Sequence, residues 1–234
     1  FVRWIAYYDV SEIQHQMRSD FAAGKMKAIQ KEIMEPRAAE YLYDLEKDKW
    51  ETNNLAFLPE YKNIVQEMRS VLKEHLIQTR DANFIPQYTL DGECSVKLPY
   101  YYRLDNNKYP IEDIVDAAML SGTGEQAILK QIELLQSDNQ FVSYWASVGL
   151  FAQRQNLQSY VSQLGKILPV LAYPPAQIWL ASAILNIKEN KEARSVLAKH
   201  LVGENRFLTI YVLNALLEMD LDKAKNLYTA IAGN

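Results

Sequence analysis

The stretch VSYWASVGL at residues 142–150 decides the fold, because two later stretches repeat its pattern. These are AQIWLASAI at residues 176–184 and LTIYVLNAL at residues 208–216, offset by 34 and then 32 positions. At their fourth position the three stretches share a bulky aromatic residue: Trp145, Trp179 and Tyr211. A small residue follows each aromatic about one helical turn later. A ring that anchors one helix, with a small residue beside it, lets the next helix approach closely, so the pattern predicts stacked helices.

Helical patterns fill the chain after Pro110, separated by short polar or turn segments. Candidate helices cover residues 111–120, 125–135, 141–153, 157–168, 176–187, 192–201, 207–219 and 223–231. Because one helix pair cannot hide its apolar face alone, we expect the pairs to stack into an α-α superhelix. The array, residues 111–234, resembles HEAT-like repeats, and armadillo-type or degenerate repeats would give a similar pattern.

A different pattern occupies the first part of the chain. Residues 40–45, EYLYDL, alternate so that Tyr41, Tyr43 and Leu45 fall on one face of a predicted strand. The β-branched and aromatic residues at positions 2–8 predict another short strand. The two segments predict a small α+β part with short antiparallel strands.

Acidic and lysine residues follow the predicted strand at positions 44–51. They lack the glycine and the terminal glutamate of an EF-hand, so we interpret them as a solvated turn instead of a calcium loop. Asn53 and Asn54 come next, and asparagine both tolerates left-handed backbone and hydrogen-bonds to it. Both asparagines are therefore predicted to be structural residues of the turn, as are Tyr41 and Tyr43 of the strand.

Two helices are predicted around this turn, one over residues 11–31 with a break at Gly24, and one over residues 60–79. The second helix carries apolar residues at three- and four-residue steps: Tyr61, Ile64, Val65, Met68, Val71, Leu72 and Leu76. Their burial, at about 1.5–3 kcal/mol each, predicts that this helix docks on the strand pair. Residues 91–110 contain Pro99 and Pro110 and are predicted to be a linker or strap packed by its tyrosines.

The segment EYLYDLEKDKWETNNLAFLPEYKNIVQEMRSVLKEHLIQTRDANFIP, residues 40–86, resembles the C-terminal end of the sulfatase family. In that family a strand of the form E-L-Y-D-L precedes an acidic turn, the motif N-N-L-A and a long amphipathic helix. The likeness covers about residues 1–90, and some bacterial members continue into helical repeats. It implies that residues 40–45 are scaffold, in a small sheet that packs against the catalytic domain.

Sulfatase chemistry requires a nucleophile within C/S-x-P-x-R, which is oxidised to formylglycine, and a calcium ion held by Asp and Asn oxygens. Cys94, the one cysteine, is followed by SVKL, and no serine opens the motif. We therefore predict no catalytic and no metal-binding residue in this chain. The resemblance implies that calcium and formylglycine belong to a catalytic domain of the same parent polypeptide. Because the sequence begins FVRWIAYYDV, without an initiator Met, we interpret it as a fragment or a processed chain.

Composition excludes several classes of protein. The net charge is −4, and acids and bases are spread evenly along the chain, which argues against a nucleic-acid partner. No apolar run approaches the ~20 residues of a membrane span. A single cysteine permits no internal disulfide and does not fix the compartment. For the parent enzyme a periplasmic or exported location is the expectation.

Two hypotheses from different classes follow. In the first, the chain is the non-catalytic C-terminal portion of a sulfatase, and its isolated form exposes an apolar face that permits self-association. In the second, it is a stand-alone helical-repeat module that binds a protein or a glycan and behaves as a monomer. Glycan binding would need exposed rings, whereas aromatics at helical spacing are more often core residues.

Overall fold

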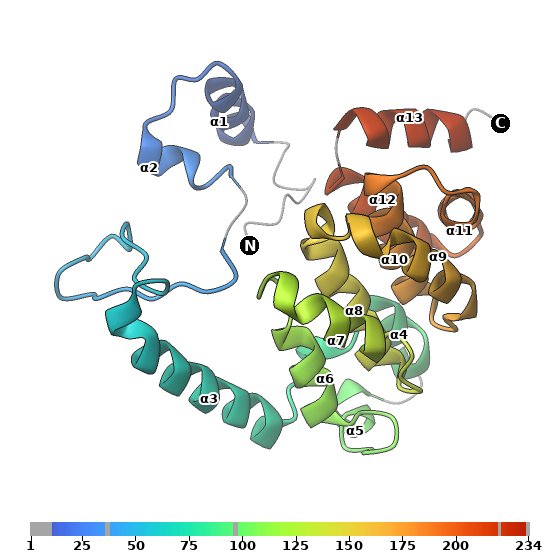
Figure 1. The fold of residues 1–234 in the computed structure, drawn as a ribbon, viewed down its shortest axis with the longest axis horizontal. Coiled ribbons are helices and arrows are strands. Elements are labelled where there is room, and N and C mark those ends of the chain that lie inside the picture. Colours follow the sequence, from blue (N-terminus) through green and yellow to red (C-terminus); the bar gives the residue numbers. More distant parts are fainter. Residues whose placement is uncertain (1–10, 36–37, 96–97, 220, 233–234) are drawn as a thin grey trace. The chain divides into compact units, whose positions relative to one another are not determined.

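The computed structural model describes residues 11–35, 38–95, 98–219 and 221–232. Within these ranges all regular structure is helical, with thirteen α-helices joined by turns and short 3-10 helices, and no strand is present (Figure 1). The chain divides into two compact units, Phe1–Arg69 and Ser70–Asn234. The predicted division into residues 1–90, 91–110 and 111–234 stays a prediction.

The first unit begins with two short helices. Helix α1, Glu12–Ala22, starts after Ser11, whose Oγ accepts a hydrogen bond from the backbone N–H of Gln14 at 3.4 Å. Gly24 has a φ of +68°, which ends this run, and α2 follows at Ala28–Lys31. The predicted helix over residues 11–31 with a break at Gly24 is therefore confirmed.

Helix α3, Lys62–Thr79, crosses from the first unit into the second. A 3-10 turn at Pro59–Tyr61 precedes it, and Pro59 occupies the first position of that turn, where its missing N–H costs nothing. The long helix predicted over residues 60–79 is confirmed.

The predicted strand over residues 40–45 is wrong, and the strand predicted over residues 2–8 lies outside the described residues. The backbone N–H of Leu55 does donate to the carbonyl of Leu42 at 2.8 Å. Beyond this bond, the side chain of Asn54, and not the backbone of a second strand, hydrogen-bonds to the backbone of residues 40–42. Its Oδ1 accepts from the N–H of Leu42 at 2.9 Å, and its Nδ2 donates to the carbonyl of Glu40 at 3.1 Å. Because a side chain satisfies the groups that a second strand would use, no β-ladder forms.

Helices of the second unit match the predicted ranges closely. They are α6 Ile111–Met119, α7 Ile128–Leu134, α8 Gln140–Ala152, α9 Val161–Ile167, α10 Pro174–Ile187, α11 Lys191–Leu201, α12 Arg206–Leu217 and α13 Leu221–Ala232. Helix α8 packs against α6, α7 and α10, and α10 also packs against α11 and α12. The core lies around α8 and α10, where Leu150, Ile178 and Leu180 are fully buried.

Residues of the ranges 80–95 and 98–109 pack onto these helices, and these ranges contain the short helices α4, Gln87–Asp91, and α5, Pro99–Tyr102. Tyr102 and Tyr109 are buried, as the prediction of a strap packed by tyrosines requires. Arg80 adopts a left-handed φ of +49°, and its guanidinium donates to the carbonyls of Arg103 at 2.5 Å and Tyr109 at 2.8 Å. These bonds tie the residues just after α3 to the segment that enters α6.

Candidate functional site

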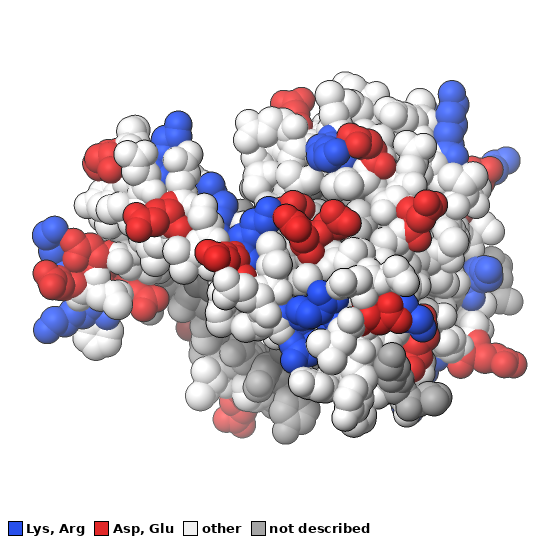
Figure 2. Space-filling model, turned by 90° about the horizontal axis from the view of Figure 1, so that it is seen from below, with Lys and Arg blue, Asp and Glu red and all other residues white. Residues whose placement is uncertain are grey.

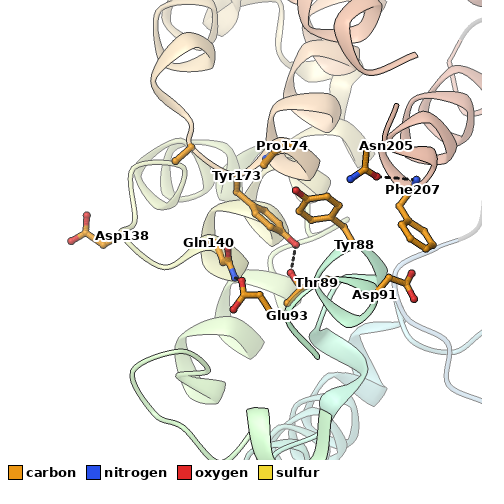
Figure 3. A pocket seen from close by; sticks show the side chains of 12 residues that line it. Tyr88, Thr89, Asp91, Glu93, Asp138, Gln140, Tyr173, Pro174, Asn205 and Phe207 are labelled. Atoms are coloured by element: carbon orange, nitrogen blue, oxygen red, sulfur yellow. Dashed lines mark hydrogen bonds between the residues drawn. The ribbon is translucent and has the colours of Figure 1, made fainter. Parts of the chain in front are cut away.

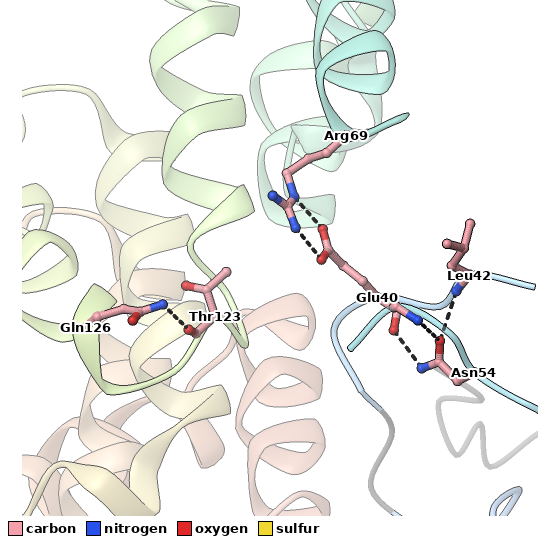
Figure 4. Close-up of polar contacts among 7 residues, drawn as sticks. Glu40, Leu42, Asn54, Arg69, Thr123 and Gln126 are labelled. Carbon is pink, nitrogen blue, oxygen red and sulfur yellow. Dashed lines mark hydrogen bonds and ion pairs between the residues drawn. The ribbon is translucent and has the colours of Figure 1, made fainter. Parts of the chain in front are cut away.

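The turn of the first unit is pinned to α3 by a charge pair. Glu40 and Arg69 form a bidentate contact, with Nε–Oε1 and Nη2–Oε2 distances of 2.6 Å (Figure 4). The Arg69 hydrogen bond lowers the pKa of the Glu40 carboxyl. Asn54 holds the backbone of Glu40 and Leu42 at the same point, and its Oδ1 also accepts from the N–H of Ala56 at 3.0 Å. The sequence motif therefore builds a connected polar clamp on the N-terminal half of α3.

Asp48 organises the acidic turn. Its carboxylate accepts the backbone N–H groups of Thr52 and Asn53, both at 2.8 Å, and these bonds lower its pKa. The left-handed residue of this turn is Glu51, with a φ of +52°. The left-handed residue thus comes two positions before Asn53, next to the two N–H groups that Asp48 accepts.

The apolar residues of the first unit and of α3 are largely uncovered. No residue of α3 is buried, which overturns the expected docking of this helix on a strand pair. Met68 is 56% exposed, and Ile64, Val71 and Leu72 are exposed with it. Trp50, at the tip of the turn, is 86% exposed. A surface hollow of about 370 Å³ lies where Phe57 and Leu58 meet Val65 at the start of α3.

The tyrosines of the predicted strand lie beside each other. The rings of Tyr41 and Tyr43 stack with centroids 6.0 Å apart and planes 24° apart. Tyr41 is exposed and Tyr43 is half-buried. The Tyr41 hydroxyl also accepts from the N–H of Ala38 at 3.0 Å. Both rings thus belong to the outer surface of the turn.

The aromatic residues of the three repeated stretches lie in or beside the core of the second unit. Trp179 is 6% exposed, and Trp145 and Tyr211 are half-buried against core residues. The indole N–H of Trp145 donates to the carbonyl of Phe84 at 3.0 Å. Tyr144 lies between these rings, with centroids 5.3 Å from Trp145 and 6.4 Å from Tyr211, and burial raises its pKa well above the usual value. These contacts give the rings packing partners within the chain.

An open pocket of about 540 Å³ lies in the second unit, where the segments that begin α8, α10 and α12 meet α4 (Figure 3). The residues just before these helices are Asn139, Tyr173 and Asn205, which repeat the spacing of 34 and 32. Sequence analysis did not find this pocket. The signal that could have found it is this recurrence of helix starts, since equivalent loops of a repeat array lie on one face.

The remaining reactive groups are set apart from this pocket's open space. Cys94 is buried, and burial together with the charge of Glu93 raises the pKa of its thiol, which disfavours a reactive thiolate. His200 is buried, and burial lowers its pKa, with Lys199 adding to the effect. His15 and His75 are exposed and lie in separate helices.

Two further properties concern the described ranges only. No group of three or more His, Cys, Asp or Glu side chains there is arranged to hold a metal ion. None of the described helices combines the length and apolarity needed to cross a membrane. On the face drawn in Figure 2, acidic and basic residues are interspersed.

No known protein family, curated protein or solved structure matches this chain. The motif of residues 40–56 and the pocket are therefore interpreted from their own geometry. The first is a clamped turn beside an uncovered apolar helix face, and the second is a polar and aromatic hollow.

Proposed function

We propose that this chain is the non-catalytic C-terminal portion of a sulfatase, which serves as scaffold, shapes the substrate cleft or mediates assembly. The parent enzyme would hydrolyse sulfate esters, and a glycan is the expected substrate. Two features support the proposal: the spacing of the motif at residues 40–56, and the way its residues act together. Asn54 holds Glu40, and Glu40 binds Arg69 of α3. The motif thereby fixes one side of the helix that carries the exposed apolar residues.

The exposed apolar stripe of α3 is the observation that carries the proposal. Ile64, Met68, Val71 and Leu72 are all exposed, although their three- and four-residue spacing puts them on one side of the helix. Because about half of each side chain is already covered, covering the rest would contribute roughly half of the 1.5–3 kcal/mol of full burial, and a partner that covers all four gains several kcal/mol. We assign the catalytic domain of the same parent polypeptide as that partner. Without it, the same stripe favours self-association.

We assign formylglycine and calcium to that catalytic domain, as the resemblance to sulfatases implies. There calcium would supply positive charge beside the sulfate, and formylglycine would supply the nucleophile. The role left to this chain is mechanical, because a domain docked on α3 would have its position set by the Glu40–Arg69 clamp.

We also propose that residues 111–234 form a HEAT-like repeat array. Helices α8, α10 and α12 begin at intervals of 34 and 32 residues, and each packs on the next. Gly149 supports this interpretation, because a Cβ at this position would overlap the side-chain amide of Gln131 from α7. At this one position the small residue predicted after the ring leaves room for the neighbouring helix.

The alternative function is a stand-alone helical-repeat module that binds a protein or a glycan. The core of the second unit and its open pocket favour it. The parent gene distinguishes the two functions. We expect the frame upstream of residue 1 to encode C/S-x-P-x-R in a catalytic domain, and an in-frame stop codon directly upstream would contradict the sulfatase proposal.

A further inference from the structure

The pocket between α4 and the starts of α8, α10 and α12 is lined by side chains that contact one another. Thr89 Oγ1 and the Tyr173 hydroxyl form a buried hydrogen bond of 2.7 Å across its floor. The ring of Tyr88 meets that of Tyr173 edge to face, with centroids 5.8 Å apart and planes 67° apart. Figure 3 shows Tyr88 between Tyr173 and Phe207. The volume of about 540 Å³ is within the range of small-ligand sites.

Carboxylates dominate the charge of this pocket. Asp91, Glu93 and Asp138 line it, and among the described residues no lysine or arginine does. Asp91 accepts from the amide of Gln87 at 2.8 Å, which leaves its charge uncancelled. Glu93 is 3.6 Å from Lys108 Nζ, so its charge is partly balanced. An anionic ligand such as a sulfate group would therefore meet net repulsion here.

Aromatic rings at the margin of the pocket already engage cations of the chain itself. The Arg206 guanidinium carbon lies 4.8 Å from the ring centroid of Phe207. Lys108 Nζ lies 5.3 Å from the ring centroid of Tyr102, whose hydroxyl donates to Glu93 at 3.2 Å. The faces of aromatic rings attract cations, and the attraction strengthens when a carboxylate lies nearby and water is excluded. The wall formed by Tyr88 and Phe207 lies beside Asp91, so it combines aromatic rings with a carboxylate.

We propose that this pocket binds an organic cation, meaning an ammonium or guanidinium group with an apolar stem. The stem packs on Tyr88 and Phe207, and the charged end faces Asp91, which Figure 3 shows at the same end of the pocket as Phe207. A free polyamine and an arginine or lysine side chain of a protein segment share this chemistry. The proposal stands independently of the sulfatase assignment, because it rests only on residues of the second unit.

The test uses the full chain labelled with ¹⁵N and four probes in separate titrations. They are spermidine, a capped Gly-Gly-Arg-Gly-Gly peptide, the same peptide with neutral citrulline in place of arginine, and diacetylchitobiose as a neutral sugar. We expect a cationic probe to shift the amide signals of residues 88–93, 138–140 and 205–207. Tighter binding of spermidine would identify a free amine as the source, and tighter binding of the arginine peptide would identify a protein side chain.

Two variants distinguish binding of the cation in this pocket from its nonspecific attraction to an acidic chain. We expect Asp91→Asn to weaken binding of the cationic probe by up to about fivefold, the upper end for an exposed charge pair. Asp113→Asn removes the same charge from an exposed position on α6 and should leave the affinity unchanged. Citrulline peptide or sugar binding as tightly as the cations would overturn the proposal. So would equal effects of the two variants, or the lack of shifts with either cation at about 10 mM.

Discussion

Asn54→Ala should release the turn that the motif of residues 40–56 builds. The substitution removes three hydrogen bonds, to the N–H groups of Leu42 and Ala56 and to the carbonyl of Glu40. Each contributes about 0.5–1.5 kcal/mol, and because the site is half-buried, water replaces part of what is lost. We expect the free energy of local opening to fall by about 1.5–3 kcal/mol. A fall of 1.4 kcal/mol corresponds to about tenfold in an opening equilibrium.

Amide hydrogen exchange measures this opening directly. The N–H of Leu55 donates to the carbonyl of Leu42, so its protection reports whether the two segments stay paired. We expect Asn54→Ala to lower that protection by about tenfold to a hundredfold, with little change in the helices of the second unit. Asn53→Ala is the matched control, because Asn53 contacts Asp48 through its backbone N–H, which the substitution keeps. Equal loss of protection in both variants would refute the role assigned to the Asn54 side chain.

Three other substitutions or conditions test the packing and the charges. Gly149→Ala should lower the free energy of unfolding by about 1–3 kcal/mol, because the new methyl overlaps Gln131. Gly165→Ala, where the nearest atom would be 3.5 Å away, should be neutral or stabilising by up to about 1 kcal/mol in the same denaturant titration; equal losses would contradict this account. The depressed pKa of Glu40 means that its contribution is present above the ordinary value of 4.5 and is lost as the pH falls through the lowered value. Leu55 protection should therefore fall on acidification, and Glu40→Gln should remove that dependence. The pKa of His200 is also lowered, so the stability of the second unit should decline as the pH falls below 6.5, and His200→Gln should flatten the profile of unfolding against pH.

The second unit was the most predictable part of the chain. Apolar residues at helical spacing mark a buried face, and predicted helices such as residues 176–187 and 192–201 agree with α10 and α11 to within about two residues. Periodicity worked there because each helix is packed on its neighbours. Trp179, expected to anchor a helix, is buried against Phe151 with ring centroids 4.9 Å apart.

The first unit was less predictable, because its alternating polar and apolar residues do not pair with a neighbouring strand. Residues 40–45 have the pattern of a strand, but hydrogen bonds from Asn54, a residue twelve positions beyond Leu42, replace the ladder. Periodicity likewise identified α3 and its apolar side. It could not say whether that side is covered, because coverage depends on what packs against the helix and not on the helix itself.

The pocket could not be predicted because four separate segments form it. Tyr88, Asp138, Tyr173 and Phe207 come from different parts of the chain and have no shared motif. Only the packing of α8, α10 and α12 in succession brings the starts of these helices together. The similar spacing of those starts, 34 and 32 residues, is visible in the sequence, but the contribution of α4 is not.

The central claim is that the apolar stripe of α3 docks a catalytic domain. The most direct measurement is the affinity of this chain for the domain encoded upstream of it, by calorimetric titration of the wild type and two variants. Met68 is 56% exposed, so covering its exposed part is worth about 1–1.5 kcal/mol, and a lysine there would also bring an unpaired charge into the docked face; Met68→Lys should therefore weaken binding by at least about tenfold. Asn63→Lys adds the same charge at an exposed polar position of α3 and should change the affinity by less than about threefold. A wild-type chain that does not bind, or a Met68→Lys chain that binds as tightly as Asn63→Lys, would contradict the claim.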